Sequence, residues 1–255
     1  MKILLFIPVY NCEKQISKVL SSLNDKWLNL IEETLIIDNR SSDNTILKAK
    51  EYIEKLSLKK IKILKNKKNI NLGGSHKVAF KYAKDNNLDK ILVLHGDNQA
   101  NINDVSILLH EFNNYSNLSY LGSRFMRGSN LKNYNKLRIV GNIFFNIIFS
   151  LISFNKISDL GSGLNLFDVK SFNYKFLKNM PNDLTFNYVL ILYISKYNIP
   201  HKFFPISWKE EDQISNMRAL SQIKKMIFII FKFIFLQNKI FNDKDINDEY
   251  KFDII

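Results

Sequence analysis

The fold of this chain is decided by the stretch Lys90-Ile91-Leu92-Val93-Leu94-His95-Gly96-Asp97-Asn98-Gln99. A strand-like run leads into a glycine and a carboxylate, which should place Asp97 just past the carboxyl end of a buried parallel strand, where open α/β sheets bind their ligands. Asp97 is therefore a candidate metal ligand, since hard cations accept carboxylate oxygens and the neutral oxygens that Asn98 and Gln99 supply. An ordinary polar turn after a strand has the same local pattern, so the rest of the chain must decide between the two interpretations.

The residues before this stretch repeat a unit of strand, polar loop and helix. We expect strands over residues 2–7, 34–37 and 61–64, each followed by apolar residues at helical spacing. Asn11 can cap the first helix, and the paired glycines of Asn69–Ser75 form a loop that permits close approach of the backbone to a ligand. The alternation predicts an α/β fold with a mostly parallel sheet, which brings Asn11, Asp38, Gly73 and Asp97 to one edge.

Two nucleotide-binding motifs are absent from the sequence. No Gly-x-Gly-x-x-Gly follows the first strand, and no Gly-x-x-x-x-Gly-Lys-Ser/Thr occurs, which argues against a dinucleotide cofactor and against a P-loop nucleoside triphosphatase. Zinc-finger spacings and an aromatic RNP-like strand are also absent, so we expect no nucleic-acid partner.

The formal net charge of +13 over 255 residues favours acidic partners, such as phosphorylated small molecules or an anionic membrane surface. The single cysteine, Cys12, cannot form an internal disulfide or a thiolate metal site, in agreement with a reducing compartment. No run reaches the roughly 18 uninterrupted apolar residues of a membrane span, and the chain does not open with a signal-peptide pattern. These features predict a cytoplasmic protein.

Four motifs resemble those of a known enzyme family in order and spacing: Ile7-Pro8-Val9-Tyr10-Asn11, Ile37-Asp38-Asn39-Arg40-Ser41, Asn71-Leu72-Gly73-Gly74 and His95-Gly96-Asp97-Asn98-Gln99. They are similar to the nucleotide-sugar half of the family-2 inverting glycosyltransferases with the GT-A fold, and most of all to the dolichyl-phosphate mannose synthase-like, or polyprenyl-phosphate glycosyltransferase, branch. The resemblance implies a GT-A nucleotide-diphospho-sugar transferase domain over residues 1–215, with a mostly parallel central sheet flanked by helices. Residues 216–255 would form an amphipathic helical tail.

The resemblance implies a nucleotide-sugar site at the loops after the first three strands. The first loop would lie against the nucleoside, Asp38 would hydrogen-bond the base with Ser41 beside it, and the third loop would lie near the ribose and diphosphate. The residues that match these positions are Pro8, Tyr10, Asn11, Glu13, Asp38, Ser41, Asn71, Gly73 and Asp97. Glu13 has a second interpretation, as a charge favoured by the dipole of the first helix.

The resemblance also implies a divalent cation, Mg²⁺ or Mn²⁺, as cofactor. Asp97 matches the second carboxylate of the family's Asp-x-Asp metal motif, and Gln99 matches the glutamine two residues further on. His95 stands where the family often has the first aspartate. Histidine suits manganese better than magnesium, and both an outer contact to the metal and simple packing stay open for His95.

On the acceptor side, Arg124 and Arg138 match family arginines that hold phosphate oxygens, a task suited to guanidinium. The loop Ser158-Asp159-Leu160-Gly161-Ser162-Gly163 resembles the family's acceptor loop, which makes Ser162 a candidate acceptor ligand. Asp159 would orient the acceptor, or serve as the base if the acceptor is a hydroxyl.

Two later stretches fit the family less well. Asp183 lies near the place where sugar-to-sugar members carry a pair of catalytic carboxylates, but its position before Leu184-Thr185-Phe186 favours a helix cap. The acidic run Lys209-Glu210-Glu211-Asp212-Gln213 departs from the family, which usually has basic residues in that region.

A polar stripe runs through Arg138–Ser150, where Arg138, Asn142, Asn146 and Ser150 recur every four residues. In the functional interpretation Arg138 and Asn142 face the site and contact the acceptor, while the apolar remainder of the helix packs partly on the protein and partly against lipid. In the alternative interpretation, the helix is buried and its polar seam is satisfied by hydrogen bonds.

The tail from Met217 onward has apolar residues at spacings of three and four, with lysines on another face. Its apolar centre, Met226–Leu236, is too short to span a bilayer but long enough to lie in its surface. We expect an interfacial anchor on the cytoplasmic face of the membrane, and a dimer or domain-capping helix is the alternative. Residues 242–255 are expected to form a charged, loosely held end.

The activity implied is transfer of a sugar from a nucleotide-diphosphate sugar with inversion, assisted by a cation at Asp97 and Gln99 and by Arg124 and Arg138. A polyprenyl phosphate is already ionised and needs no base, which favours a lipid-phosphate acceptor. One rival is a soluble transferase that adds a sugar to a glycan hydroxyl in capsule or lipopolysaccharide synthesis. Another is a non-catalytic nucleotide-sugar binding protein, suggested by His95 in place of an aspartate.

Overall fold

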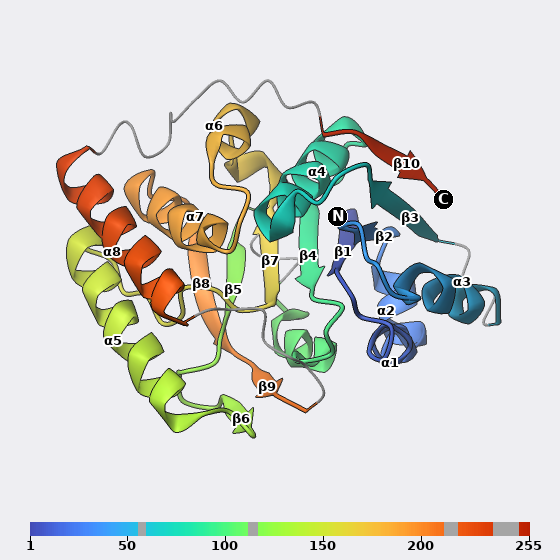
Figure 1. Ribbon diagram of the computed structural model, residues 1–255, viewed down its shortest axis with the longest axis horizontal. Coiled ribbons are helices and arrows are strands. Elements are labelled where there is room, and N and C mark those ends of the chain that lie inside the picture. The colour runs from blue at the N-terminus through green and yellow to red at the C-terminus, as the bar shows by residue number, and fades with distance from the viewer. Residues whose placement is uncertain (56–59, 112–116, 212–218, 237–249) are drawn as a thin grey trace.

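The computed structural model describes residues 1–55, 60–111, 117–211, 219–236 and 250–255 (Figure 1). Its main sheet has eight strands in the order β10-β3-β2-β1-β4-β7-β5-β8. These strands are β1 (Ile3–Val9), β2 (Glu33–Asp38), β3 (Ile61–Asn66), β4 (Lys90–Leu94), β5 (Ser119–Ser123), β7 (Leu164–Asp168), β8 (His201–Pro205) and β10 (Phe252–Ile254). A second, two-stranded sheet pairs β6 (Asn130–Lys132) with β9 (Ser207–Lys209) in parallel.

The sheet is mostly parallel, as predicted. β1 pairs in parallel with β2 and β4, β2 with β3, and β5 with β8, whereas β7 and β10 run antiparallel to their neighbours. The helices are α1 (Ile16–Ser21), α2 (Asp25–Leu30), α3 (Thr45–Lys55), α4 (Asn71–Asp85), α5 (Lys136–Ser153), α6 (Tyr174–Asn179), α7 (Thr185–Lys196) and α8 (Ala219–Phe235), with short 3₁₀ turns η1 (Ile102–Leu108) and η2 (Val169–Ser171).

The central strands are buried on both faces of the sheet. In β4, Ile91 and Val93 belong to the core on the side of α4 and α7, whereas Leu92 and Leu94 belong to the core on the side of α1 and α2. This division follows from the alternation of side chains along a strand. A ligand can therefore reach these strands only at their ends, in the loops.

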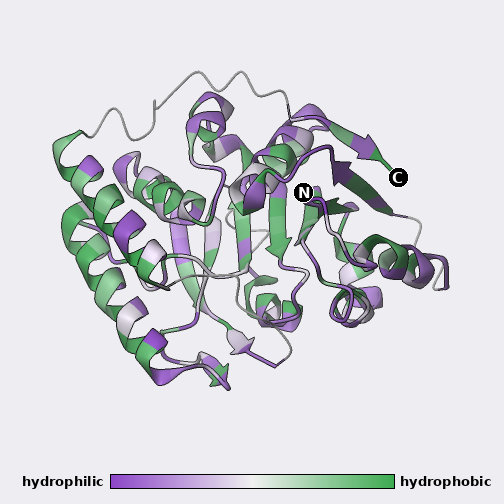
Figure 2. Ribbon diagram, viewed as in Figure 1, coloured by the Kyte–Doolittle hydropathy of each residue, from purple (hydrophilic) through white to green (hydrophobic). Residues whose placement is uncertain are grey.

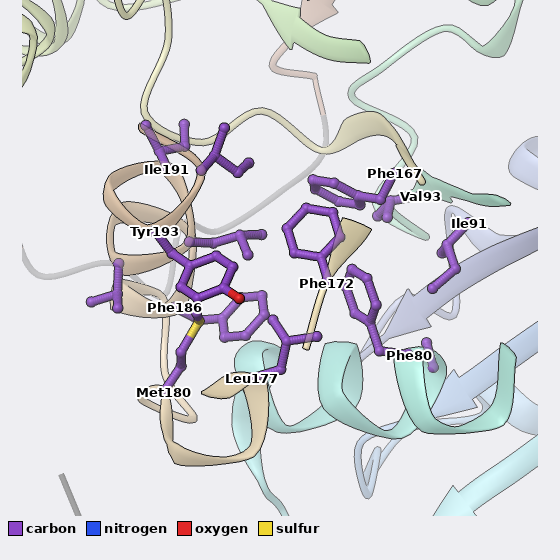
Figure 3. Packing of buried hydrophobic residues seen from close by; sticks show 14 of the residues in the cluster. Phe80, Ile91, Val93, Phe167, Phe172, Leu177, Met180, Phe186, Ile191 and Tyr193 are labelled. Carbon is purple, nitrogen blue, oxygen red and sulfur yellow. The ribbon is translucent and has the colours of Figure 1, made fainter. Parts of the chain in front are cut away.

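Aromatic packing joins α4 to the sheet on one face (Figure 3). The ring of Phe80 in α4 lies with its centroid 5.6 Å from that of Phe167 in β7 and 5.3 Å from that of Phe172. Phe186 of α7 and Met180 lie in the same cluster. Rings at these separations contribute beyond their buried area, which makes this cluster a rigid support for the loops at the sheet edge.

The predicted strands over 2–7, 34–37 and 61–64 and the strand before Asp97 are all present with small shifts at their ends. Two local predictions were wrong. Asn11 does not cap a helix, because α1 begins at Ile16 and Asn11 lies in the preceding loop with φ of 53°. The stretch Asn69–Ser75 is not a glycine loop, because α4 begins at Asn71 and both glycines lie in its first turn.

The C-terminal part is more integrated than the sequence predicted. β10 adds an antiparallel strand beside β3, so the expectation of a loosely held end was wrong for Phe252–Ile254. In α8, Met226, Ile229 and Phe233 are buried in the same core as α5 and α7. The predicted boundary between residues 215 and 216, Asp212 and Gln213 of the acidic run, and residues 242–249 lie outside the described residues.

Gly73 is required where the first turn of α4 packs against the segment before α7. A Cβ on Gly73 would lie 2.6 Å from Phe186 Cβ and 2.6 Å from the carbonyl oxygen of Pro181. The neighbouring Gly74 donates its N–H to the carbonyl of Asn182 at 3.1 Å. Because part of this contact is backbone, the structure cannot absorb a side chain by a rotamer change alone.

We expect Gly73→Ala to lower the free energy of unfolding by about 1–3 kcal/mol, the usual cost of overpacking a tight contact. Gly141→Ala in α5 is the matched control, since a Cβ there meets nothing within 4 Å and alanine favours the helix. Urea denaturation followed by circular dichroism measures both. Equal stabilities of the two variants would contradict the packing role of Gly73.

Candidate functional site

The loops after β1 and β2 are tied together at the carboxyl edge of the sheet. The N–H of Asn11 donates to Ser41 Oγ at 2.9 Å, and Asn11 Oδ1 accepts from the N–H of Ser42 at 2.9 Å. Glu13 accepts from the N–H of Asn44 at 3.2 Å. The structure thus brings Asn11, Glu13 and Ser41 together, as the sequence motifs predicted, and Glu13 is used as a link between loops rather than as a helix-dipole charge.

Asp38 lies at the end of β2 and is fully buried, with both carboxylate oxygens 3.2 Å from the N–H of Ser41. This hydrogen bond shapes the loop after β2. In the neighbouring loop after β1, Tyr10 is 41% exposed to solvent. Pro8 corrects a prediction. It is buried inside β1, and its carbonyl accepts from the N–H of Gly96 at 3.0 Å, so it joins β1 to β4 instead of lying against a nucleoside.

The start of α4 completes this edge. Asn71 is exposed, has φ of 58°, and donates its N–H to Asn69 Oδ1 at 2.9 Å. Asn39, which sequence reasoning missed, donates to Asn69 Oδ1 at 2.8 Å and accepts from the N–H of Ile70 at 2.8 Å. Gly73 corrects a second prediction, because its α-carbon faces the Pro181–Phe186 segment and not an open site.

Asp97 follows β4 at the same edge. Gly96 allows it to do so, because a Cβ on Gly96 would lie 2.4 Å from Val9 Cγ1. Asp97 Oδ1 accepts from the N–H of Gln99 at 3.1 Å, and Asn98 makes the turn with φ of 58°. Burial raises the pKa of Asp97 to about 6, against the lowering effect of the Gln99 N–H.

A cation would fit beside Asp97. Among the described residues no ion pair includes Asp97, so its carboxylate has the raised pKa of an uncompensated charge. The described residues contain no cluster of three or more histidine, cysteine or acidic side chains able to hold a metal. A cation at Asp97 would therefore occupy a one-carboxylate site, the kind that suits Mg²⁺ or Mn²⁺ and whose shell is completed by water and substrate phosphate oxygens.

His95 packs against neighbouring residues and, in the described part of the chain, does not lie in a group of metal-binding side chains. Its N–H donates to the carbonyl of Gly163 at 3.1 Å, and a Cβ on Gly163 would lie 2.8 Å from the His95 ring. The ring of His76 meets it edge-on, with 6.2 Å between centroids. Burial, and then the positive charge of Arg124, lower the pKa of His95 to about 4, so the imidazole is neutral at neutral pH. Its Nε2 has no hydrogen-bond partner among the described residues.

Arg124 and Asp159 bind one another, which corrects the expectation that each contacts substrate. Arg124 Nε lies 2.8 Å from Asp159 Oδ2, and Nη2 lies 2.8 Å from Oδ1. Arg124 Nη2 also donates to the carbonyl of Gly161 at 3.0 Å. The side chains are 10% and 1% exposed. A bidentate pair that is buried and further hydrogen-bonded is costly to open, so neither group is available as a phosphate ligand or a base.

Ser162 is likewise inside the protein. It is 2% exposed, and its hydroxyl donates to the carbonyl of Leu164 at 3.1 Å, so it shapes the loop and does not reach an acceptor. Asp183 accepts from the N–H of Thr185, the first residue of α7, at 2.9 Å, but the N-cap residue itself is Leu184, so Asp183 lies one residue before the predicted cap position. Asp183 also forms an ion pair with Lys225 of α8.

Arg138 remains near the surface at the beginning of α5. Its Nη1 lies 2.7 Å from Glu210 Oε1, and its guanidinium stacks over the ring of Tyr134 at 4.8 Å. Asn142 donates to the hydroxyl of Tyr134 at 3.2 Å. Arg124 Nη1 also lies 3.4 Å from that hydroxyl, so Tyr134 connects both arginines with Asn142.

The rest of the polar stripe is hydrogen-bonded to the protein, except for Asn146 Oδ1, which is buried and has no hydrogen-bond partner among the described residues. Asn146 donates to the carbonyl of Ser158 at 2.9 Å, and Ser150 Oγ accepts from the N–H of Ile157 at 2.9 Å. Both interpretations of α5 thus hold in part. Its later turns bind the protein, while Arg138 in its first turn stays 32% exposed.

Sequence reasoning missed several residues that surround this region. Tyr134 carried no pattern signal, and Glu210 was noted only as part of an acidic run. A pocket of about 360 Å³ lies between α1, the loop after β4 and the β6–β9 pair, and of the candidate residues named from the sequence Asn98 and Gln99 line it. The N–H of Lys209 donates to the carbonyl of Gln99 at 2.9 Å, which joins β9 to the loop that carries Asp97.

Two proteins of known activity are similar in sequence. A UDP-N-acetylglucosamine–dolichyl-phosphate N-acetylglucosaminyltransferase of Methanococcus voltae is 29% identical over 176 residues, covering 65% of this chain and 68% of that protein. A dolichol-phosphate mannosyltransferase of Pyrococcus furiosus is 28% identical over 134 residues, covering 52% of this chain and 36% of that protein. The second match therefore spans about a third of its relative.

The fold is similar to that of solved glycosyltransferases. A crystal structure of glucosyl-3-phosphoglycerate synthase from Mycobacterium tuberculosis with Mn²⁺, UDP-glucose and phosphoglyceric acid has a TM-score of 0.59 at 11% identity and covers 92% of this chain and 79% of that one. This likeness confirms the GT-A fold predicted from the sequence. The family model for glycosyl transferase family 2 matches residues 5–175, well over half of the molecule, and this chain is therefore a glycosyltransferase that belongs to glycosyl transferase family 2.

Proposed function

We propose that this glycosyltransferase moves a sugar, with inversion, from a nucleotide-diphosphate sugar to a polyprenyl-phosphate-type lipid acceptor, with a divalent cation as cofactor. The two sequence relatives are named as transferases that act on dolichyl or dolichol phosphate, which supports this acceptor class. A glycosyltransferase structure of the same fold was crystallised with Mn²⁺ and UDP-glucose, which supports the donor and the cation.

In this proposal the donor lies over the loops after β1, β2 and β4. The exposed ring of Tyr10 and the linked Asn11 and Ser41 loops would bind the nucleoside, with Asp38 holding the loop in shape from below. Asp97 and Gln99 would hold the cation. When bound, the cation supplies positive charge to the departing diphosphate, the group on which negative charge accumulates during transfer.

The choice of acceptor rests on one observation: the two carboxylates considered as bases are both engaged. Asp159 is held by Arg124 in a buried bidentate pair, and Asp183 Oδ1 accepts from the N–H of Thr185 at the start of α7. A sugar hydroxyl needs a positioned base, whereas a phosphate monoester is already ionised and attacks without one. An enzyme with this arrangement is therefore better suited to a lipid phosphate, whose charge Arg138 would receive at the start of α5.

The apolar faces of α5 and α8 support association with a membrane surface. The two helices pack beside each other at one end of the molecule, and both are composed mostly of hydrophobic residues (Figures 1 and 2). Both expose large apolar side chains. The residues of this apolar face, each 39–81% exposed, are Leu137, Val140, Ile143, Phe144, Ile147 and Leu151 in α5 and Leu220, Ile223, Ile227, Phe228, Phe231, Ile234 and Phe235 in α8. Exposed apolar area of this extent is rare on a protein that meets only water.

The geometry favours a surface position over a span. By length and composition α5 is the one described helix that could cross a membrane, with 17% of its 18 residues buried. Its polar stripe, however, is hydrogen-bonded to the protein, so only the opposite face is open to lipid. Exposed lysines beside the apolar face, Lys136, Lys156 and Lys224, would meet anionic head groups. The buried stripe of α8 differs from its exposed one, so the helix can contact protein and lipid at once.

We expect purified protein with Mn²⁺ to transfer sugar from a UDP-sugar to undecaprenyl phosphate and not to a glycan hydroxyl. Product analysis by mass spectrometry with both acceptor classes measures this. Transfer to glycan hydroxyls alone would replace the proposed acceptor, and donor binding without turnover under all conditions would support a binding protein.

We expect Asp97→Asn to lower kcat about 10²- to 10³-fold, the usual cost of losing one electrostatic contact to the leaving group, and chelation by EDTA to abolish transfer. Asp85→Asn is the matched control, because Asp85 is exposed and forms an ion pair with Lys81 at the end of α4. Full activity of Asp97→Asn at equal Mn²⁺ would remove the cation site from the proposal.

We expect the double variant Phe144→Asp, Ile227→Asp to reduce binding to vesicles of phosphatidylglycerol and phosphatidylcholine at least tenfold, since both side chains are more than half exposed in the apolar face. Leu47→Asp in α3, exposed to a similar 53%, is the control. Cosedimentation measures binding, and transfer to a short, water-soluble prenyl phosphate should be unchanged. Equal binding of both variants would exclude this face as the lipid contact.

A further inference from the structure

Two lysines lie beside the loop that carries Asp97, and Arg138 is connected to the strands that carry them. Lys132 and Lys209 are register partners in the parallel β6–β9 pair, so they lie side by side. Both line the 360 Å³ pocket together with Gln99. Arg138, the third cation, is linked to the same strands because Glu210, its ion-pair partner, donates its N–H to the carbonyl of Lys132 at 3.1 Å.

Two consecutive glutamates form ion pairs with these cations. Glu210 Oε1 lies 2.7 Å from Arg138 Nη1, and Glu211 lies 3.3 Å from both Lys132 Nζ and Lys209 Nζ. Hydrogen bonds from Lys209 and Lys132 lower the pKa of Glu211. This acidic pair is the part of the sequence that departs from the family's usual basic residues.

The pair of Arg138 with Glu210 differs from that of Arg124 with Asp159 in every feature that decides whether it can open. The first has one nitrogen–oxygen contact and side chains 32% and 24% exposed, whereas the second is bidentate and almost fully buried. Arg138 Nε is buried and donates to no group among the described residues. A partly exposed single contact contributes little, and a phosphate can offer the guanidinium two oxygens in place of one.

The ring of Tyr134 keeps the guanidinium in place when its partner changes. The Arg138 guanidinium carbon lies 4.8 Å from the ring centroid, and the hydroxyl of Tyr134 is held by Asn142. Exchange of Glu210 for another anion therefore requires movement of one glutamate side chain and none of the arginine. Glu211 is also accessible, since its side chain is 35% exposed.

We propose that Glu210 and Glu211 stand in for substrate phosphate groups, so that a phosphate-bearing substrate must displace them from Arg138, Lys132 and Lys209 in order to bind. This inference rests on the proposed function only for the identity of that substrate. The two glutamates are then specificity-determining residues, because they admit ligands with enough phosphate charge to win the exchange and reject weaker anions.

Removal of one competitor should tighten the binding of phosphate. In the full-length protein, we expect Glu210→Gln to bind geranyl phosphate, and Glu211→Gln to bind inorganic pyrophosphate, roughly three- to tenfold more tightly than wild type by isothermal titration calorimetry. Glu111→Gln is the matched control. Glu111 forms an ion pair with Lys202 near the start of β8, at the far end of the strand from Glu210 and Glu211, so this substitution should change neither affinity.

A double-mutant cycle of Glu210 and Arg138 separates competition for Arg138 from a structural role of Glu210. If Glu210 competes at Arg138, Glu210→Gln should give no gain in an Arg138→Gln background, and its thermal midpoint should stay near that of wild type. Unchanged or weaker phosphate binding by both glutamate variants overturns the inference, and so does a gain that persists without Arg138.

Failure of the proposed function is distinguishable from failure of this inference. If wild type does not transfer sugar to undecaprenyl phosphate but Glu211→Gln still binds pyrophosphate more tightly, the lipid acceptor is wrong and the competition stands. If wild type transfers to undecaprenyl phosphate but neither variant gains affinity, the acceptor stands and the competition is wrong.

Discussion

Parallel pairing of β1 with both β2 and β4 is the constraint on which the site depends. The three strands are buried on both faces, so their polar residues can lie only at the ends, and parallel pairing puts these ends at one edge. Gly96 extends the arrangement by one step. Because Gly96 has no side chain, the backbone after β4 can pack directly against Val9. This places Asp97 beside the loops that contain Asn11 and Asp38.

The two arginines near the acceptor side illustrate how environment divides one residue type between two tasks. Arg124 is enclosed by Asp159, Gly161 and three aromatic rings, and it holds the loop before β7 in place. Arg138 has a single carboxylate contact and partial exposure. A buried charge must be fully paired, whereas a charge at the surface can exchange partners, so the first is structural and the second is available for a ligand.

α5 serves two surroundings because a helix has separate faces. Its polar stripe binds the 157–158 loop, Tyr134 and Glu210, while its opposite face is open and apolar (Figure 2). α8 does the same with a buried stripe and an exposed one. The proposed lipid contact and the proposed phosphate contact thus belong to one helix, which would bring a membrane-borne acceptor to Arg138 at its first turn.

The sequence by itself determined the strand–loop–helix repeats, the parallel sheet and the positions of Asn11, Asp38 and Asp97 at its edge, because these follow from local periodicity and from the ends of apolar runs. Only the tertiary structure decided what each polar side chain contacts. Pro8, Gly73 and Ser162 turned out to be buried in packing contacts, Asp159 was paired with Arg124, and Arg138 with Glu210. Such pairs join residues that are 35 and 72 positions apart, and local pattern carries no information about which distant charge will neutralise a given one.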